Sequence, residues 1–182
     1  MIDYTALGVW TGVTTGLVAL VTWLCDRARD RARMYLETVR CLEAEFSTAR
    51  MYRNRRIAAE AFRSGILTGA TDAIDEIVDF FEGVAYYEEI GAIRARDAWT
   101  CFFSYMYRFY HLAHEYIEQT RNDDPTLWQS FGLLYTKLYK IEAKDRKKQI
   151  KAKRNRILLP RDIEAKYIDQ FIEEEANLRI DE

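Results

Sequence analysis

The sequence has few prolines and glycines, which interrupt helices, and few cysteines, which could cross-link the chain. Its 182 residues include only two prolines and eight glycines, a composition that excludes collagen-like and linker-rich proteins. Its three cysteines (Cys25, Cys41 and Cys101) are irregularly spaced. They form neither a disulfide framework nor a zinc-binding pattern, which is typical of a reducing compartment. Aromatic residues make up 14% of the chain, too large a share for an intrinsically disordered protein, and the length suits one ordinary domain.

Catalytic motifs are equally scarce. The only two histidines are His111 and His114, and no serine or cysteine nucleophile has a recognisable context, so a hydrolytic triad has no support. The glycine-rich stretch GVWTGVTTG is not followed by GK[ST], which excludes a phosphate-binding loop there. The Glu-x-x-His pairs of helical di-metal sites are missing, so we expect no metal and no cofactor. The sequence therefore leans away from an enzyme without deciding the question.

A long uncharged run lies near the amino terminus. The 22 residues from Tyr4 to Cys25 carry no charge, and as a helix they extend about 33 Å, enough to cross a bilayer core. Tyr4 and Trp10 lie toward one end and Trp23 at the other, where aromatic rings prefer the headgroup boundary. Four arginines follow directly: Arg27, Arg29, Arg31 and Arg33. The positive-inside rule thus predicts a single transmembrane helix over 4–25, with the amino terminus outside and the rest cytoplasmic.

A cleaved signal peptide and a soluble core helix are the alternatives to this membrane helix. A cleaved signal peptide would carry its basic residues before the apolar run, and here they follow it. A soluble core helix stays open as an alternative, because five threonines lower the hydrophobicity of the run.

Three glycines recur at every fourth position within the run. Gly8, Gly12 and Gly16 lie on one helical stripe, and small residues at this spacing let membrane helices approach closely. The stripe favours a homo-oligomer assembled in the membrane. Whether such a ring of helices would be an anchor cluster or a pore is left open.

The remainder of the chain shows helical periodicity throughout. We expect an all-α fold in which the transmembrane helix is followed by a cytoplasmic bundle of about four to five helices. The predicted parts are a charged juxtamembrane helix over 26–63, a helical bundle core over 64–140, and a basic helix end with an acidic final helix over 141–182. Helix breaks are expected at Gly65, Gly69, Gly91, the turn at 122–125 with Asp124 as cap and Pro125 at the first helical position, and Pro160.

Charge is segregated along this layout. Residues 64–136 carry twelve acidic and four basic side chains, whereas Lys137–Arg156 holds ten basic and two acidic ones. Such a basic run binds nucleic acid, protein or a membrane surface, or else pairs with the acidic parts of the chain itself. The candidate basic patch comprises Lys147, Lys148, Lys151, Lys153 and Arg154.

His114 follows Arg108 by six residues. The segment from Arg108 to His114 resembles the motif of HEPN ribonucleases, small helical domains that dimerise to join two such motifs. The resemblance implies that His114 acts as general acid or base toward a ribose hydroxyl and that Arg108 holds the phosphate. Phe109 stands where those enzymes usually have a polar residue. The alternative is an ordinary helix face on which Arg108 pairs with Glu115 or another acidic residue.

A longer resemblance covers about residues 54–140. The runs DEIVDFFEGVAYYEEIGAIRARDAWTCFFSYMYRFY and YIEQTRNDDPTLWQSFGLLYTKL resemble the DUF4760 family of bacterial proteins. The matching positions are Phe81, Glu82, Gly91, Tyr110 and Arg121. The resemblance implies one amino-terminal membrane helix before a helical domain, hence a location at the bacterial inner membrane, and it implies no activity.

The layout also resembles that of small membrane-anchored accessory proteins of RNA-targeting CRISPR systems, some of which join one membrane helix to a HEPN-like domain and form pores. Three functional hypotheses result. The first is a non-enzymatic membrane effector or scaffold that self-assembles, in its sharpest version a pore in antiviral (phage) defence. The second is a membrane-tethered HEPN-like ribonuclease. The third is an adaptor that binds protein or RNA through its basic helix.

Overall fold

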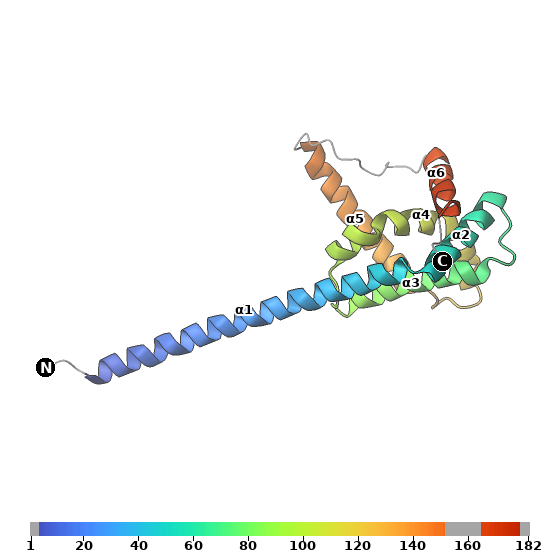
Figure 1. The fold of residues 1–182 in the computed structure, drawn as a ribbon. Coiled ribbons are helices and arrows are strands. Elements are labelled where there is room, and N and C mark those ends of the chain that lie inside the picture. Colours follow the sequence, from blue (N-terminus) through green and yellow to red (C-terminus); the bar gives the residue numbers. More distant parts are fainter. Residues whose placement is uncertain (1–3, 152–164, 179–182) are drawn as a thin grey trace. The chain divides into compact units, whose positions relative to one another are not determined.

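The computed structural model describes the backbone of residues 4–151 and 165–178, and the side chains of residues 18–148 and 168–178. These residues form six α-helices and contain no strand (Figure 1). The helices are α1 (Tyr4–Phe46), α2 (Ala49–Ser64), α3 (Thr71–Glu89), α4 (Ala95–Arg121), α5 (Gln129–Lys151) and α6 (Ala165–Ala176). The prediction of an all-α protein is therefore confirmed.

The chain divides into two compact units, Met1–Thr38 and Val39–Glu182. Most of α1 belongs to the first unit, where the helix runs without interruption through the predicted membrane segment 4–25. Among the residues that the structure describes, no helix is long and apolar enough to cross a bilayer. Residues 4–17 are described by their helical backbone alone, so the transmembrane assignment stays a prediction.

The charged segment 26–63 is divided between two helices, where its lack of glycine and proline predicts only one. α1 ends at Phe46 and α2 begins at Ala49. Thr48 between them has extended backbone geometry (φ −71°, ψ 152°), and its hydroxyl accepts a hydrogen bond from the backbone N–H of Met51 at 3.2 Å. A threonine that caps a new helix in this way terminates the preceding one without a glycine.

Two of the predicted glycine breaks end helices as expected. α2 ends at Ser64 and is followed by Gly65 with φ 70°, and α3 ends at Glu89 shortly before Gly91 with φ 73°. Both glycines occupy the left-handed region that ordinary side chains disfavour, which is why the chain turns there.

The start of α5 was predicted wrongly. The sequence places the first helical residue at Pro125 with Asp124 as its cap, but residues 125–128 form turns and α5 begins at Gln129. The Asp124 carboxylate does accept a hydrogen bond from the backbone N–H of Thr126 at 2.9 Å. The helix cannot continue from that turn because Trp128 has φ 55°.

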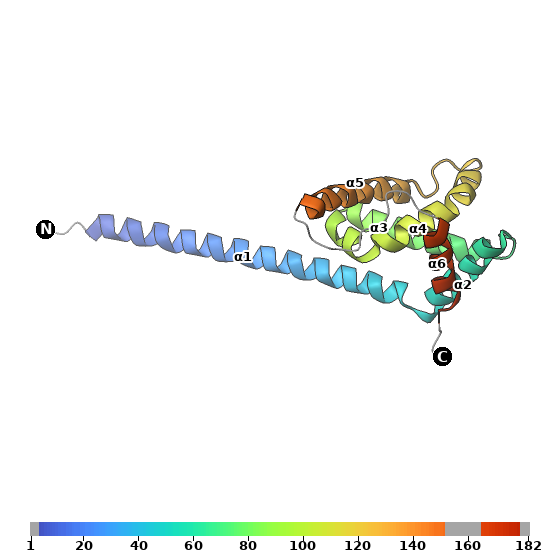
Figure 2. The ribbon, with the colours of Figure 1, turned by 90° about the horizontal axis from the view of Figure 1, so that it is seen from above.

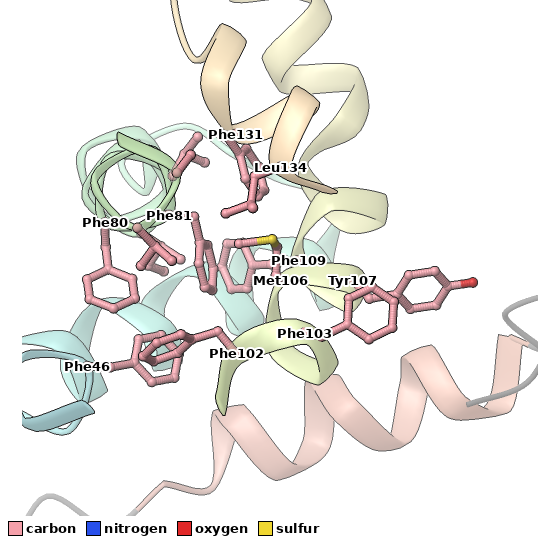
Figure 3. Close-up of a cluster of buried hydrophobic side chains, with 14 of the residues drawn as sticks. Phe46, Phe80, Phe81, Phe102, Phe103, Met106, Tyr107, Phe109, Phe131 and Leu134 are labelled. Carbon is pink, nitrogen blue, oxygen red and sulfur yellow. The ribbon is translucent and has the colours of Figure 1, made fainter. Parts of the chain in front are cut away.

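The core of the second unit is largely aromatic. Phe46 at the end of α1 stacks on Phe80 of α3, with ring centroids 5.0 Å apart, and Phe81 stacks on Phe131 of α5 at 5.6 Å. Phe102 of α4 lies beside them and is buried (Figure 3). α5 packs against both α3 and α4 (Figure 2). Burial of side chains this large supplies most of the stability of a helical bundle.

A buried ion pair joins α2 to α6. Arg55 donates from Nε and from a terminal nitrogen to the two oxygens of Glu175, each at 2.6 Å, and the side chains are only 4% and 5% exposed. The Arg55 guanidinium also lies over the rings of Phe46 at 4.4 Å and Tyr105 at 4.9 Å. The pair is bidentate, and the π faces stabilise the cation where water cannot.

Replacing Glu175 by Gln is expected to lower the free energy of unfolding by about 3–5 kcal/mol, because it leaves the Arg55 charge buried without a counter-ion. Replacing both residues with apolar ones, Arg55→Met and Glu175→Leu, is expected to recover most of that loss. Denaturant unfolding followed by circular dichroism measures both. A double variant no more stable than Glu175→Gln would show that the aromatic surroundings, and not the unpaired charge, set the cost.

Candidate functional site

Arg108 and His114 have different neighbours in the structure. The Arg108 guanidinium lies over the ring of Phe171 in α6, 5.1 Å from its centroid. His114 is exposed and lies beside Tyr110, whose ring stacks on Tyr135 of α5 at 4.1 Å. Within one chain, no contact joins these two described side chains. A site completed by a second chain, as the HEPN resemblance implies, stays a prediction.

Glu82 and Arg121, two positions of the DUF4760 resemblance, fix the connection between α4 and α5. The Glu82 carboxylate, from α3, accepts hydrogen bonds from the backbone N–H groups of Ser130, at 3.1 Å, and Phe131. Arg121 donates to the carbonyl oxygens of Leu127 at 2.9 Å and Trp128 at 2.6 Å. Glu82 thus caps the first turn of α5 from another helix, and Arg121 holds the turn before it.

The remaining three of those positions also have structural roles. Phe81 is fully buried and stacks on Phe131, Tyr110 stacks on Tyr135, and Gly91 supplies the left-handed turn after α3. All five positions of the resemblance therefore have contacts or backbone geometry that explain them through the architecture of the second unit.

Replacing Glu82 by Ala is expected to lower the free energy of unfolding by about 1–2 kcal/mol, because the first N–H groups of α5 lose their acceptors. Hydrogen exchange at the amides of Ser130 and Phe131 should accelerate at the same time. The matched control is Glu89→Ala on the same helix, whose side chain is exposed and should change stability by less than about 0.5 kcal/mol. Unchanged exchange at Ser130 and Phe131 would contradict the capping role.

Tyrosine and histidine side chains gather where α4 meets α5. The ring nitrogen Nε2 of His111 lies 3.1 Å from the Tyr135 hydroxyl, and the Tyr107 ring lies 4.8 Å from the His111 ring and 6.0 Å from the Tyr135 ring. Desolvation by these neighbours, with a smaller contribution from the charge of His114, lowers the pKa of His111 below its ordinary value. Burial likewise raises the pKa of Tyr135, so its hydroxyl stays protonated. The cluster therefore favours a neutral His111.

The lowered pKa of His111 predicts that the protein loses stability in acid. Because the folded pKa of His111 lies below its unfolded value near 6.5, the unfolded chain binds more protons as pH falls through that range, and stability falls with it. We expect the melting temperature to drop between pH 7.5 and 5.5, and His111→Gln to reduce this drop. An unchanged pH dependence in that variant would show that His111 is not its cause.

The basic run divides into paired and unpaired parts. Lys137 forms an ion pair with Glu88 of α3, and Arg146 lies 3.9 Å from Glu142 on the same helix. This much agrees with the expectation that the run pairs with acidic parts of the chain.

Four further lysines of α5 are exposed and have no ion-pair partner among the described residues: Lys140, Lys144, Lys147 and Lys148. Lys140, Lys144 and Lys147 follow helical spacing and share one face of α5. Within the predicted patch, Lys151 is described by its backbone alone, and Lys153 and Arg154 lie outside the described residues. Of the predicted patch, the structure thus describes the side chains of Lys147 and Lys148. Lys147 forms the solvated lysine face of α5 together with Lys140 and Lys144.

The other predicted site residues are Gly8, Gly12 and Gly16. They fall on α1, where the backbone is helical and the surroundings are not described, so the packing stripe stays a prediction. Among the described residues, no group of three or more histidine, cysteine, aspartate or glutamate side chains is arranged to hold a metal ion.

Comparison with known proteins adds no relative. The chain matches no protein-family model, no curated protein and no solved structure. The resemblances to the DUF4760 family and to HEPN-like proteins accordingly stay predictions.

Proposed function

We propose that this protein is a single-pass membrane protein that self-assembles and acts as a non-enzymatic scaffold or effector. The proposal rests on the observation that several polar residues of the second unit hold its helices together. Glu82, Arg121 and the Arg55–Glu175 pair all hold helices together, and Arg108 packs on α6. These groups are committed to architecture, which favours a protein that binds and assembles over one that catalyses.

The sequence supports the membrane part of the proposal. The uncharged run over 4–25 is long enough to span a bilayer, and four arginines follow it on the side that the positive-inside rule assigns to the cytoplasm. The proposed location is the bacterial inner membrane, with the amino terminus outside and the second unit in the cytoplasm. Assembly would occur through the stripe of Gly8, Gly12 and Gly16, because close approach of helix backbones is what holds membrane helices together.

The solvated lysine face of α5 is the proposed contact for a further partner. Lys140, Lys144 and Lys147 point their charge into solvent without an internal counter-ion among the described residues, and such a face attracts an anionic protein surface or RNA. In phage defence, partner binding at this face would trigger membrane perturbation by the assembled anchors. This is the sharpest version of the proposal.

The glycine stripe is tested by the mass of the full-length protein in detergent, measured by light scattering corrected for bound detergent. Wild-type protein should form a closed oligomer, and Gly8→Leu with Gly12→Leu should reduce it to smaller species because the bulkier side chains separate the helices. The matched control carries Thr14→Leu and Val21→Leu, which add bulk on the opposite face of the same helix and should leave the oligomer intact.

A wild-type protein that is monomeric in detergent would contradict the proposed self-assembly. If the glycine variant kept its mass and wild-type protein cleaved RNA, with the cleavage lost in His114→Ala, the membrane-tethered ribonuclease would replace the scaffold.

A further inference from the structure

The second unit contains a cavity of about 540 Å³ between the end of α1, the start of α2 and α3. Its apolar lining includes Leu42, Met51 and Phe80, all of which are buried. The volume lies in the range of small-molecule sites, which are typically apolar clefts with a few polar groups that fix orientation. The cavity involves neither the glycine stripe nor the lysine face of α5.

The charged groups around the cavity are mostly negative. Glu45, Glu76 and Asp79 contribute three carboxylates and Arg50 one guanidinium, so the rim carries two net negative charges. Arg50 binds both oxygens of Glu76, at 2.7 and 2.8 Å, and this hydrogen-bonded guanidinium holds the pKa of Glu76 below its ordinary value. Glu76 is therefore the main partner of Arg50, and the charge of Glu45 attracts the same guanidinium more weakly.

The other two carboxylates retain acceptor capacity. Asp79 accepts one hydrogen bond, from Nε1 of Trp128 at 2.7 Å on Oδ1, which leaves its second oxygen. Glu45 is exposed, and its carboxylate accepts no hydrogen bond from a described side chain. A cation entering the cavity would therefore meet two carboxylates that are able to receive its N–H groups.

Gly83 lines the same cavity in the interior of α3. A glycine within a helix is less stable there than alanine. The backbone of Gly83 does not require glycine, because the positive-φ glycines are Gly65, Gly69 and Gly91. Packing does not require it either, because a Cβ built on Gly83 would have no atom within 4 Å. What the glycine does provide is unobstructed backbone surface at the cavity wall.

We propose that this cavity binds a small organic cation, an amine or guanidine carried on a flat apolar body. The body lies against Phe80, Met51 and the bare backbone at Gly83, and the cationic group donates to the carboxylates of Glu45 and Asp79. A neutral compound of the same shape would keep the apolar contacts and lose the charge-assisted hydrogen bonds. An anion would meet the net negative rim.

The test compares tryptamine with tryptophol, a neutral analogue in which a hydroxyl replaces the amine. Both are titrated into the full-length protein in detergent, and the amide resonances of Gly83 and its neighbours are followed by NMR, so that probe dissolved in the micelle does not register. We expect tryptamine to bind about tenfold more tightly than tryptophol, since partly exposed charge pairs contribute modestly. Equal affinities, or no saturable shift up to about 10 mM, would overturn the proposal.

Two variants test the roles of the residues. Glu45→Gln should reduce tryptamine affinity several-fold and leave tryptophol binding unchanged, whereas Glu115→Gln, which removes an exposed carboxylate of α4, should change neither. Gly83→Ala should raise the melting temperature by about 2–4 °C through better helix propensity while weakening binding of both probes. The matched control, Ser104→Ala at an exposed position of α4, should leave binding unchanged. A more stable Gly83→Ala protein that binds tryptamine with wild-type affinity would overturn the proposal.

Discussion

The second unit depends on one buried electrostatic contact, the bidentate pair between Arg55 and Glu175. The two residues are 120 positions apart in the chain, so the pair closes a large loop and fixes where the final helix docks. Its desolvation is expensive, and in such cases the mutual attraction repays the cost only when geometry and surroundings are favourable. Here both oxygens of the carboxylate are engaged at 2.6 Å, and three aromatic rings face the guanidinium: Phe46, Tyr52 and Tyr105.

The Arg55 guanidinium of α2 therefore contacts residues of three other helices, α1, α4 and α6. Phe46 ends α1, Tyr52 and Arg55 belong to α2, Tyr105 to α4 and Glu175 to α6. A helix docked through apolar contacts alone could shift by a turn at modest cost. A buried charge must meet its counter-ion, so we expect the pair to specify where α6 docks more than to add net stability.

Polar side chains of α3 likewise position the start of α5. Asp79 binds the Trp128 side chain and Glu82 binds the first backbone N–H groups of α5. Two further features of the second unit are open to solvent, the lysine face of α5 and the acidic cavity beside Gly83. Their opposite charges suit different ligands, an anionic partner at the lysine face and a cation in the cavity, as proposed above.

The helices and turns that depend on neighbouring residues alone could be predicted from the sequence. The all-α class, the turns at Gly65 and Gly91, and the final amphipathic helix α6 follow from periodicity and from backbone freedom at glycine. The end of α1 at Phe46 was missed because the signal is a single capping threonine within a run that lacks glycine and proline.

Other features were missed because distant residues determine them. The delayed start of α5 results from Glu82 of α3 and from the positive φ of Trp128, neither of which leaves a signal at Pro125. Arg55 is one of ten arginines between residues 26 and 63, and nothing in its neighbourhood distinguishes a buried ion-pair partner from a solvated one. For Arg108 and His114, spacing along α4 does not reveal that the Arg108 side chain lies over Phe171 of α6, whereas His114 lies beside Tyr110 of its own helix.

The most direct test of this account is hydrogen exchange of α6 in the full-length protein. If the Arg55–Glu175 pair makes the final helix an integral part of the second unit, the amides of α6 should be as protected as those of α2 and should exchange in the same cooperative opening. Rapid exchange of α6 while α2 to α5 stay protected would show that the Arg55–Glu175 pair does not hold the helix. That result would contradict the central claim about the second unit.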